Sequence, residues 1–558
     1  MLQKETLNGA QLAVRLLERQ GVRRITGIPG GAILPFYDAL SQSTQITHVL
    51  ARHEQGAGFM AQGAARVSGE VAVCAATSGP GVMNLLTAIA DARLDSIPLV
   101  AITGQVAASL IGTDAFQEVD TYGMTVPITK HNFLVQSAAD LLRIIPRAFT
   151  IAASGRPGPV VVDIPKDVML ESVEIAEWPA PGVAEPLPDV CPEPLTRAAA
   201  MIDAAERPML YLGGGVVHSG ASALALALAD KAALPTVMSL MALGAMPPEH
   251  PLYLGMLGMH GARCTNLALD ECDLLIVAGA RFDDRATGRV SLFCPNAKII
   301  HIDIDPAELD KIKTANIAVC GDVKHSLTCL LDQVKTQARA TWVSRVAELK
   351  RTQPMRFPGE DNPRSHYGLI RAVAACVDDT SIIATDVGQH QMWVAQAYPL
   401  RRPRQWLTSG GLGTMGFGLP TAIGAAMAQP ERTVICFSGD GSILMNIQSL
   451  ATAAEENVNV KLVLMNNRAL GLVVQQQKLF YGERVFASKF KGVPDFMQIA
   501  EGFGWPTLDL DAESDPQAAL RQAFAAPGPC FIHASIDMQE QVLPMVAPGA
   551  ANTQMIGG

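Results

Sequence analysis

Two apolar strands and the polar residues at their ends decide the fold of this chain: residues 433–442, TVICFSGDGS, and residues 460–467, VKLVLMNN. The Gly-Asp-Gly of the first stretch and the Asn-Asn of the second are separated by 24 residues, 442–465. Mg²⁺ prefers oxygen ligands and usually combines one or two protein side chains with phosphate oxygens and water. Asp440 and Asn467 offer such oxygens, so the two strand ends predict a magnesium diphosphate clamp.

The residues beside Asp440 also suit a phosphate. Gly439 and Gly441 have no side chain, so the backbone can approach an anion closely. Ser442 follows where a helix N-terminus would present free N–H groups. A GDG alone is a common turn, and only its combination with the second strand and the NN makes the clamp specific.

The length of the chain and two proline-rich stretches predict three domains. The 558 residues exceed what one hydrophobic core normally holds. Proline-rich stretches at 178–194 and 351–366 are predicted linkers, and they leave α/β segments at 1–175, 190–335 and 360–558. Each segment alternates short apolar runs with helix-length stretches, which is typical of parallel strands buried on both faces. We therefore predict an α/β protein with three doubly wound parallel-sheet domains, flavodoxin-like or Rossmann-like.

The first and third segments resemble each other weakly. HEQGAGFMAQGAAR and GTMGFGLPTAIGAA each lead to an apolar strand and a glycine turn. The spacing of 23 positions between Gly56 and Gly79 recurs between Gly416 and Gly439. Relatedness of the two segments and chance similarity among α/β units both remain open at this level.

Composition excludes several classes of protein. Hydrophobic residues make up 49% and charged residues 17%, and a net charge of −10 without a basic block argues against nucleic acid as a partner. No apolar run reaches the 18 residues of a membrane span. Ten cysteines without metal-ligand spacing suit a reducing cytosol, so we expect a cytoplasmic protein. The N-terminus enters helical periodicity directly, unlike a signal or transit peptide.

The GDG and NN pair at this spacing resembles the signature of thiamine diphosphate (ThDP) enzymes. The resemblance implies that Glu54, in HEQGAGFMAQGAAR, hydrogen-bonds N1′ of the cofactor's pyrimidine, whereas a lone glutamate there would only favour a helix N-terminus. SGGLGTMGFGLPTAIGAA matches the segment at the aminopyrimidine, with backbone contacts from Gly413 and Met415 and the Met415 side chain as a wedge. The GxGxxG inside it is a weak dinucleotide signal by itself. TDVGQHQMW adds Gln389 and His390 near the diphosphate.

The similarity extends over nearly the whole chain and is closest to the catalytic subunit of acetohydroxyacid synthase, also called acetolactate synthase. It is carried by IPGGAILPFYDAL, TSGPGVMN, GTDAFQE, GRPGPVVVDIPKDV, GMHGARCTN, GARFDDRATG, HIDIDPAE and VLPMVAPGAANTQM. GARFDDR is the most discriminating string, because it follows an apolar strand where α/β sheets bind ligands, although a solvated salt-bridge loop is the alternative.

The resemblance implies three cofactors, ThDP, Mg²⁺ and FAD, the last of them structural and bound by the middle domain. The implied diphosphate and magnesium positions are Gly439, Asp440, Gly441, Ser442, Asn467, Ala469, Gly471 and Leu472, with Asp440, Asn467 and Ala469 on the metal. The implied FAD positions are Arg156, Gly213, Gly214, Gly215, His260, Gly279, Arg281, Asp283, Asp303, Ile304 and Asp322.

The resemblance also implies substrate positions. Gly31 and Gln117 would help hold the intermediate or its oxyanion, Lys166 would line the entrance, and Arg285 would pair with the acceptor's carboxylate. Lys166 and Arg285 would otherwise be unremarkable surface charges. Family members carry Met and Trp in a string like GMVxQW, whereas this chain reads GLVVQQQ, with Gln476 at the tryptophan position. This departure predicts a weak preference between acceptors.

The implied reaction is decarboxylation of pyruvate and condensation of the two-carbon unit with a second pyruvate or with 2-ketobutyrate, in branched-chain amino acid synthesis. The family places the glutamate of one subunit against the diphosphate site of another, so a homodimer is the expected minimum, with a small regulatory subunit as a possible partner. The alternatives are a flavin-linked ThDP pyruvate oxidase, which should lack GARFDDR and the VLPMVAPGAA tail, and an inactive cofactor-binding paralogue.

Overall fold

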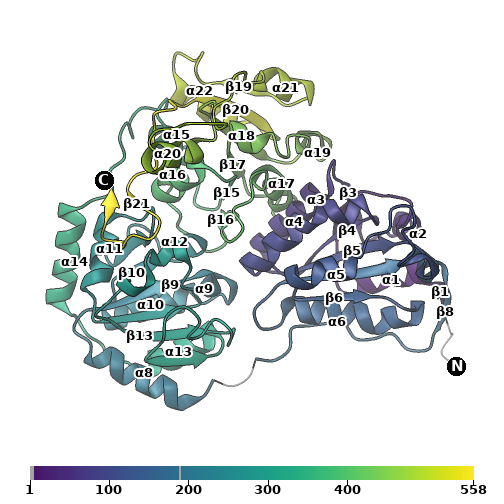
Figure 1. Cartoon of the computed structure of the whole chain (residues 1–558), viewed down its shortest axis with the longest axis horizontal. Coiled ribbons are helices and arrows are strands. Elements are labelled where there is room, and N and C mark those ends of the chain that lie inside the picture. The colour runs from purple at the N-terminus through teal and green to yellow at the C-terminus, as the bar shows by residue number, and fades with distance from the viewer. Residues whose placement is uncertain (1–4, 188–189, 558) are drawn as a thin grey trace.

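The computed structural model describes residues 5–187 and 190–557. Three six-stranded sheets, in which every neighbouring pair of strands is parallel, form three lobes (Figure 1). We call them the N-terminal unit (5–175), the middle unit (192–352) and the C-terminal unit (366–535). The predicted fold class is confirmed. No helix in the described ranges is long and apolar enough to cross a membrane.

The N-terminal unit has the strand order β3-β2-β4-β5-β7-β6. Its strands are β2 (Arg24–Gly27), β3 (Thr47–Leu50), β4 (Ala72–Ala76), β5 (Leu99–Gln105), β6 (His131–Leu134) and β7 (Pro159–Pro165). Its helices are α1 (Gly9–Arg19), α2 (Leu34–Ser41), α3 (Glu54–Ser68), α4 (Pro80–Asp95), α5 (Thr121–Thr125), α6 (Leu141–Ala153) and α7 (Lys166–Leu170).

The C-terminal unit has the order β16-β15-β17-β18-β20-β19, which repeats the N-terminal order when strands are counted within each unit. Its strands are β15 (Ile382–Thr385), β16 (Trp406–Leu407), β17 (Val434–Gly439), β18 (Val460–Asn466), β19 (Thr507–Asp509) and β20 (Cys530–Ser535). Its helices are α15 (His366–Ala374), α16 (Gln389–Ala397), α17 (Gly418–Ala428), α18 (Asp440–Ile443), α19 (Ser449–Glu455), α20 (Gly471–Phe480), α21 (Phe496–Gly502) and α22 (Pro516–Ala525). The shared order favours relatedness of the two units over chance similarity.

The middle unit has the order β11-β10-β9-β12-β13-β14, the order of dinucleotide-binding folds. Its strands are β9 (Pro208–Leu212), β10 (Thr236–Met238), β11 (Tyr253–Met256), β12 (Leu274–Ala278), β13 (Lys298–Asp303) and β14 (Ile317–Cys320). Its helices are α8 (Pro192–Ala204), α9 (Gly214–His218), α10 (Ser222–Ala232), α11 (Arg263–Glu271), α12 (Asp284–Thr287), α13 (Val323–Gln333) and α14 (Ala340–Thr352).

Helices α3 and α17, the two glycine-rich segments of the sequence, pack directly against each other. A Cβ added at Gly63 of α3 would lie 2.0 Å from the Thr421 carbonyl oxygen of α17. A Cβ added at Gly424 of α17 would lie 1.8 Å from the Met60 carbonyl oxygen of α3. Because each glycine faces the other helix's backbone, the resemblance between the two segments reflects a close contact that larger residues would prevent.

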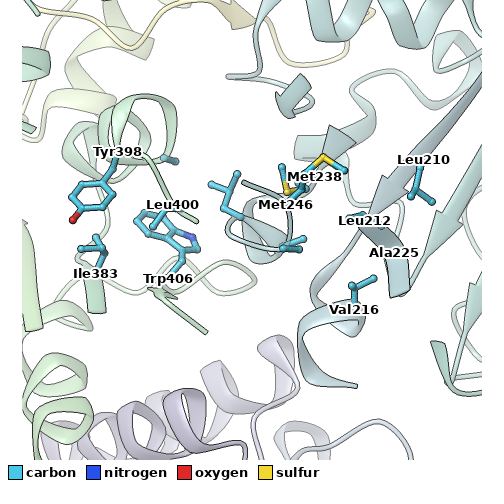
Figure 2. Close-up of a cluster of buried hydrophobic side chains, with 14 of the residues drawn as sticks. Leu210, Leu212, Val216, Ala225, Met238, Met246, Ile383, Tyr398, Leu400 and Trp406 are labelled. Carbon is cyan, nitrogen blue, oxygen red and sulfur yellow. The ribbon is translucent and has the colours of Figure 1, made fainter. Parts of the chain in front are cut away.

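The middle and C-terminal units share a continuous apolar core (Figure 2). Leu210 and Met238 of the middle sheet belong to the same cluster of buried side chains as Leu400 and Trp406 of the C-terminal unit. Met246 lies between the two groups in Figure 2. Burial of this surface fixes the two units relative to each other and so fixes any cavity between them.

The chain departs from the sequence-based expectation at two places. The described N-terminus does not enter a helix at once: β1 (Glu5–Asn8) first pairs antiparallel with β8 (Ser172–Ile175), a partner too distant for local periodicity to reveal. The middle unit also continues past residue 335, its predicted end, because Trp342 of α14 is buried and donates a hydrogen bond of 3.0 Å to the Pro208 carbonyl.

The C-terminal tail returns to the middle unit, where β21 (Met545–Val546) pairs with β22 (Met555–Ile556). In Figure 1 the yellow tail lies beside α11. The Val546 N–H donates to the Met259 carbonyl at 2.9 Å, and the Asn552 amide donates to the Ala286 carbonyl at 2.8 Å. The tail therefore contacts two segments of the middle unit that carry family strings, GMHGARCTN through Met259 and GARFDDRATG through Ala286.

Buried Asp163 on β7 predicts that stability falls as pH rises. It accepts hydrogen bonds from Thr103 Oγ1 at 2.6 Å and Gln105 Nε2 at 3.1 Å, and burial raises its pKa to about 7. The folded state then binds a proton that the unfolded state, with a pKa near 4, releases. Between pH 5.5 and 8.5 the unfolding free energy should fall by about 2 kcal/mol through this group alone.

Denaturant unfolding at several pH values, with Asp163→Asn as the variant, measures this contribution. In the variant the unfolding free energy should no longer fall by this about 2 kcal/mol between pH 5.5 and 8.5, even if the variant is more or less stable than wild type at any one pH. Asp38→Asn, which alters an exposed acid of the same unit, is the matched control. Equal pH slopes in wild type and Asp163→Asn would contradict the assignment.

Candidate active site

The strand ends predicted to hold a metal lie side by side in the C-terminal unit. Gly439 of β17 pairs with Met465 of β18, which places the residues that follow both strands at one edge of the sheet. Backbone N–H groups near the Asp440 carboxylate, among them that of Ala469, act to lower its pKa. Asn467 Oδ1 also accepts from Ala469 N, at 3.1 Å. The geometry thus brings Asp440, Asn467 and Ala469 together.

Two buried polar atoms at this edge have no protein partner among the described residues: Asp440 Oδ2 and His390 Nε2. Asp440 is 2% exposed, and burial raises its pKa to about 6. His390 lies against Gly439, where an added Cβ would come within 2.9 Å of its Nδ1, and burial lowers its pKa to about 3. A cation on the free carboxylate oxygen and an anionic phosphate beside it would supply the missing partners, so these residues fit a magnesium diphosphate group.

Gln389 positions the clamp from the protein side. Its Oε1 accepts from Asn467 Nδ2 at 2.9 Å, and its Nε2 donates to the Glu540 carbonyl at 2.8 Å. A Cβ at Gly471 would lie 1.9 Å from that Oε1, so only glycine leaves room for this contact. The Gln389 amide, predicted near the diphosphate, is therefore occupied with orienting Asn467.

The loop before α17 closes over the clamp. Gly413 has φ +70°, and nothing lies within 4 Å of its added Cβ, so its backbone is open to a ligand. The Met415 methyl carbon would lie 3.6 Å from a Cβ at Gly441. Met415 thus stands beside the clamp, the place that the wedge residue requires. Ser442, predicted beside the phosphate, is buried and donates to the Val387 carbonyl at 2.6 Å.

The N-terminal unit gathers a second set of predicted residues. Glu54, 9% exposed, begins α3, and its Oε2 accepts from Asn84 Nδ2 at 2.9 Å. Its Oε1 would lie 3.5 Å from a Cβ at Gly81. A Cβ at Gly79 would lie 2.8 Å from the Gln117 carbonyl oxygen. Glu54 and Gln117 therefore surround the same turn, which follows β4.

Two further predicted substrate residues belong to this unit. Gly31 follows Gly30, whose added Cβ would meet the Thr77 side chain at 2.5 Å, so it also lies near that turn. Gly31 itself has nothing within 4 Å of an added Cβ. Lys166 is exposed at the first position of α7.

The large cavity of one chain does not bring the two sets together. The large cavity reaches Gly413, Leu472 and Gln476, but its lining includes none of Glu54, Gly31, Gln117 and Lys166. Large apolar side chains are exposed on both units, among them Phe116 (88%) in the N-terminal unit and Phe486 (82%) in the C-terminal unit. Exposed apolar side chains of this size are typical of surfaces that a partner covers.

That cavity, of about 970 Å³, opens where all three units meet. Most of the predicted FAD positions line it: Arg156, Gly214, Gly215, His260, Gly279, Arg281, Asp283, Asp303, Ile304 and Asp322. Gly213 supports it from behind, since an added Cβ would lie 2.1 Å from the Gly279 carbonyl oxygen. These glycines follow β9 and β12, the switch point at which such sheets bind ligands.

The charges in the cavity suit a ligand with phosphates and hydroxyl groups. Arg156 NH1 pairs with Asp305 at 3.0 Å and Glu308 at 2.8 Å, which anchors it across two units. Arg281 faces the same space, as does Asp303, whose pKa burial raises. Arginines bind phosphates and an aspartate at this strand end binds ribose hydroxyls, so the donor set fits a dinucleotide such as FAD.

Two more predicted FAD positions are fixed by the backbone. Burial lowers the pKa of His260 to about 4, and its Nδ1 donates to the Pro544 carbonyl at 3.2 Å. Asp283 caps α12 by accepting from Arg285 N and Ala286 N, both at 3.1 Å. The tail thus holds one wall of the cavity through Pro544.

The cavity is also lined by the predicted acceptor residues Arg285 and Gln476, with Leu472 beside them. Leu472 and Gln476 are four residues apart on α20, so both side chains lie on one face of that helix and line the cavity. The Arg285 side chain, 65% exposed, lines it from the middle unit. Gln475 between them points away and holds Val542 through hydrogen bonds of 2.8 and 2.9 Å.

Comparison with known proteins agrees with this layout. Three family models of the thiamine pyrophosphate enzymes match: the N-terminal TPP binding domain at 7–124, the central domain at 195–330 and the C-terminal TPP binding domain at 386–534. The large subunit of Escherichia coli K12 acetolactate synthase isozyme 1 is 63% identical over 554 residues, covering 99% of this chain and 98% of that protein. The isozyme 2 large subunit of the same organism is 45% identical, covering 99% of both. A probable acetolactate synthase large subunit of Methanocaldococcus jannaschii is 43% identical, covering 99% and 95%.

The chain belongs to the acetolactate synthase large-subunit family. Membership in this ThDP-dependent family confirms the family resemblance derived from the sequence. The three relatives are all named as acetolactate synthase large subunits, and none is a pyruvate oxidase.

One buried acid of this acetolactate synthase family member was missed at the sequence level. Asp386 follows β15, and its carboxylate accepts from Gly416 N at 2.7 Å, Val387 N at 3.1 Å and Ser438 Oγ at 3.1 Å. Burial raises its pKa to about 6. Asp386 thereby joins the loop over the clamp to β17. The sequence does hold a signal for Asp386: it directly follows the apolar strand β15, in TDVGQH, as Asp440 follows β17.

Proposed function

We propose that this chain is the catalytic subunit of an acetohydroxyacid synthase. It decarboxylates pyruvate and joins the two-carbon unit to a second pyruvate, giving 2-acetolactate, or to 2-ketobutyrate, giving 2-aceto-2-hydroxybutyrate, in valine, leucine and isoleucine biosynthesis. The observation that carries this proposal is the unpartnered Asp440 carboxylate oxygen beside Asn467, on a clamp whose closing loop also lines the large cavity.

The residues divide the work. Bound ThDP supplies a thiazolium carbanion and an electron sink for decarboxylation. Asp440, Asn467 and the Ala469 carbonyl would hold Mg²⁺, and Gly413 and Met415 would receive the pyrimidine. Glu54 would hold a proton at N1′. Arg285 would pair with the acceptor's carboxylate, since its planar guanidinium can meet both oxygens.

FAD would occupy the cavity of the middle unit without taking part in a redox step. The adenine dinucleotide would be held by Arg156 and Arg281 at the phosphates and by Asp303 at hydroxyl groups. Support comes from the strand order of this unit and from the residues that line the cavity.

A homodimer is the proposed minimum. Glu54 and the clamp belong to different units, and Glu54 does not line the cavity that the clamp's closing loop reaches, so a second copy would bring its Glu54 to the clamp of the first. The exposed Phe116 and Phe486 give apolar area to such a contact. A small regulatory subunit is a proposed further partner, and a cytoplasmic location suits the ten cysteines, all free thiols.

Product analysis tests the proposal. The purified chain with ThDP, Mg²⁺ and FAD is given pyruvate alone, and then pyruvate with 2-ketobutyrate. We expect acetolactate in the first case and both acetohydroxy acids in the second. Carbon dioxide with acetate or acetyl phosphate, and no carboligation product, would instead indicate the oxidase alternative. No turnover with all cofactors bound would indicate the inactive paralogue.

Gln476 predicts little preference for 2-ketobutyrate over pyruvate as acceptor. It lines the cavity at the position where the family carries tryptophan, and an amide cannot pack on the extra methyl group as an indole does. Such a hydrophobic contact is worth ~1–3 kcal/mol. At equal acceptor concentrations the two products should therefore form within about threefold of each other, and Gln476→Trp should raise the ratio of acetohydroxybutyrate to acetolactate about tenfold.

The competition is measured by chromatography of both products, with Gln476→Leu as the apolar control that lacks a ring. A wild-type ratio above about tenfold in favour of acetohydroxybutyrate, unchanged in Gln476→Leu, would show that another side chain makes the contact.

A further inference from the structure

Three charged side chains form a fully buried cluster outside the residues assigned so far. Arg66 of α3 pairs with Asp91 at 3.1 Å and with Asp95 at 2.8 Å, both on α4. The side chains are 4%, 0% and 0% exposed, respectively. One arginine faces two carboxylates, so the pairing of α3 with α4 leaves one negative charge to be stabilised by other donors. Buried charges need such partners.

Those donors come from the loop that closes over the clamp, in another unit of the chain. Asp95 accepts from Gly410 N at 3.1 Å and from Gly411 N at 2.7 Å. Asp91 Oδ2 accepts from the Ser409 hydroxyl and from Thr414 Oγ1, the latter at 3.1 Å. The hydrogen bonds from the loop therefore stabilise the negative charge that Arg66 of α3 leaves unpaired.

Among the described residues, the C-terminal unit itself holds this loop through hydrogen bonds near its two ends, including one from Gln391 Nε2 to the Ser409 carbonyl at 3.3 Å. At one end Gln391 Nε2 donates to Thr408 Oγ1 at 2.8 Å, and at the other Asp386 accepts from Gly416 N at 2.7 Å. The polar contacts of 409–414 with other segments go mainly to Asp91 and Asp95. Between the two anchored stretches lies Gly413, which lines the cavity with its backbone open.

We propose that Asp91 and Asp95 are positioning residues: from the N-terminal unit they set the shape of the 409–414 loop that receives the pyrimidine of ThDP. The role of the loop rests on the proposed function. Neither carboxylate touches reacting atoms. They act by accepting hydrogen bonds from the amides and hydroxyls of the loop. Without these two carboxylates the loop would lose those bonds, and the backbone at Gly413 and Met415 would no longer be held in one orientation.

The test begins with the cofactor-free chain and does not depend on activity. Hydrogen exchange followed by mass spectrometry compares wild type with Asp95→Asn, which keeps the size of the side chain and removes its charge. We expect amides of 409–416 to exchange at least tenfold faster, with α3 and α4 unchanged. Asp140→Asn, at a partly exposed ion pair of the same unit that is far from the loop in sequence, is the control and should behave as wild type.

Binding and kinetics complete the test. In Asp95→Asn the Kd for ThDP, measured with Mg²⁺, should rise about tenfold, and the near-ultraviolet circular dichroism of the bound pyrimidine should change. The Kd for Mg²⁺ with inorganic diphosphate alone should stay within twofold, because the clamp is intact. A carboligation assay should show a lower kcat with an unchanged KM for pyruvate.

A second variant guards against misfolding of Asp95→Asn. Thr414→Val removes a hydroxyl from the loop side only, and it should raise loop exchange and ThDP Kd about threefold. Unchanged exchange in 409–416 in both variants, or equal acceleration throughout α3 and α4, would overturn the proposal and leave the cluster as a packing feature. Altered exchange and ThDP affinity in a chain that makes no acetohydroxy acid would instead uphold the positioning role and refute the proposed function.

Discussion

Glu54→Gln is expected to lower kcat for acetolactate formation by about 10²- to 10⁴-fold, the usual contribution of a general acid or base. The buried carboxyl would share a proton with N1′, and an amide cannot take that proton up or give it back. Folding and ThDP binding should persist, because the glutamine keeps the shape and can still accept from Asn84 Nδ2, as Glu54 does at 2.9 Å.

The comparison requires steady-state rates, ThDP affinity and FAD content of wild type and variant. Glu70→Gln, an exposed acid just after the same helix, is the matched control and should retain full activity. If Glu54→Gln keeps more than about a third of the wild-type rate, Glu54 is not the activating acid.

Asp440→Ala is expected to weaken Mg²⁺-dependent ThDP binding by about 100-fold or more and to leave FAD binding within twofold. The variant removes one anionic ligand of a hard cation, while the flavin cavity is built mainly by the middle unit. Retention of each cofactor after gel filtration, followed by absorbance and by titration, measures the two affinities. Loss of both cofactors in parallel would mean misfolding and would contradict this division.

The same two variants test the proposed dimer. When Glu54→Gln and Asp440→Ala chains are refolded or expressed together, half of the dimers are mixed, and each mixed dimer has one site with Glu54 and Asp440 both intact if the sites are shared between chains. About a quarter of the wild-type activity should then return. No recovery, with mixed dimers demonstrated by affinity tags, would place both residues of a site in one chain.

Much of this protein could be predicted from short stretches of its sequence. Continuous apolar runs such as VKLVLMNN and TVICFSGD became buried parallel strands, because such runs have few other ways to remove their side chains from water. Asp440 and Asn467 come together because neighbouring parallel strands end at one edge of the sheet. Family motifs extended this to residues such as Arg281 and Asp303, which line a common cavity.

The tertiary structure alone decided the rest. The matching strand order of the outer units, the packing of α14 on the middle sheet and the pairing of β1 with β8 depend on partners far away in the chain. Asp95 shows the reason most clearly. In the sequence it is one acid at the end of a helix, yet in the fold it binds two glycine amides 315 and 316 residues away. Local patterns determine which segments become strands and helices, because those depend on neighbours along the chain. The partner of a buried polar group is decided only when distant units pack and water is excluded between them.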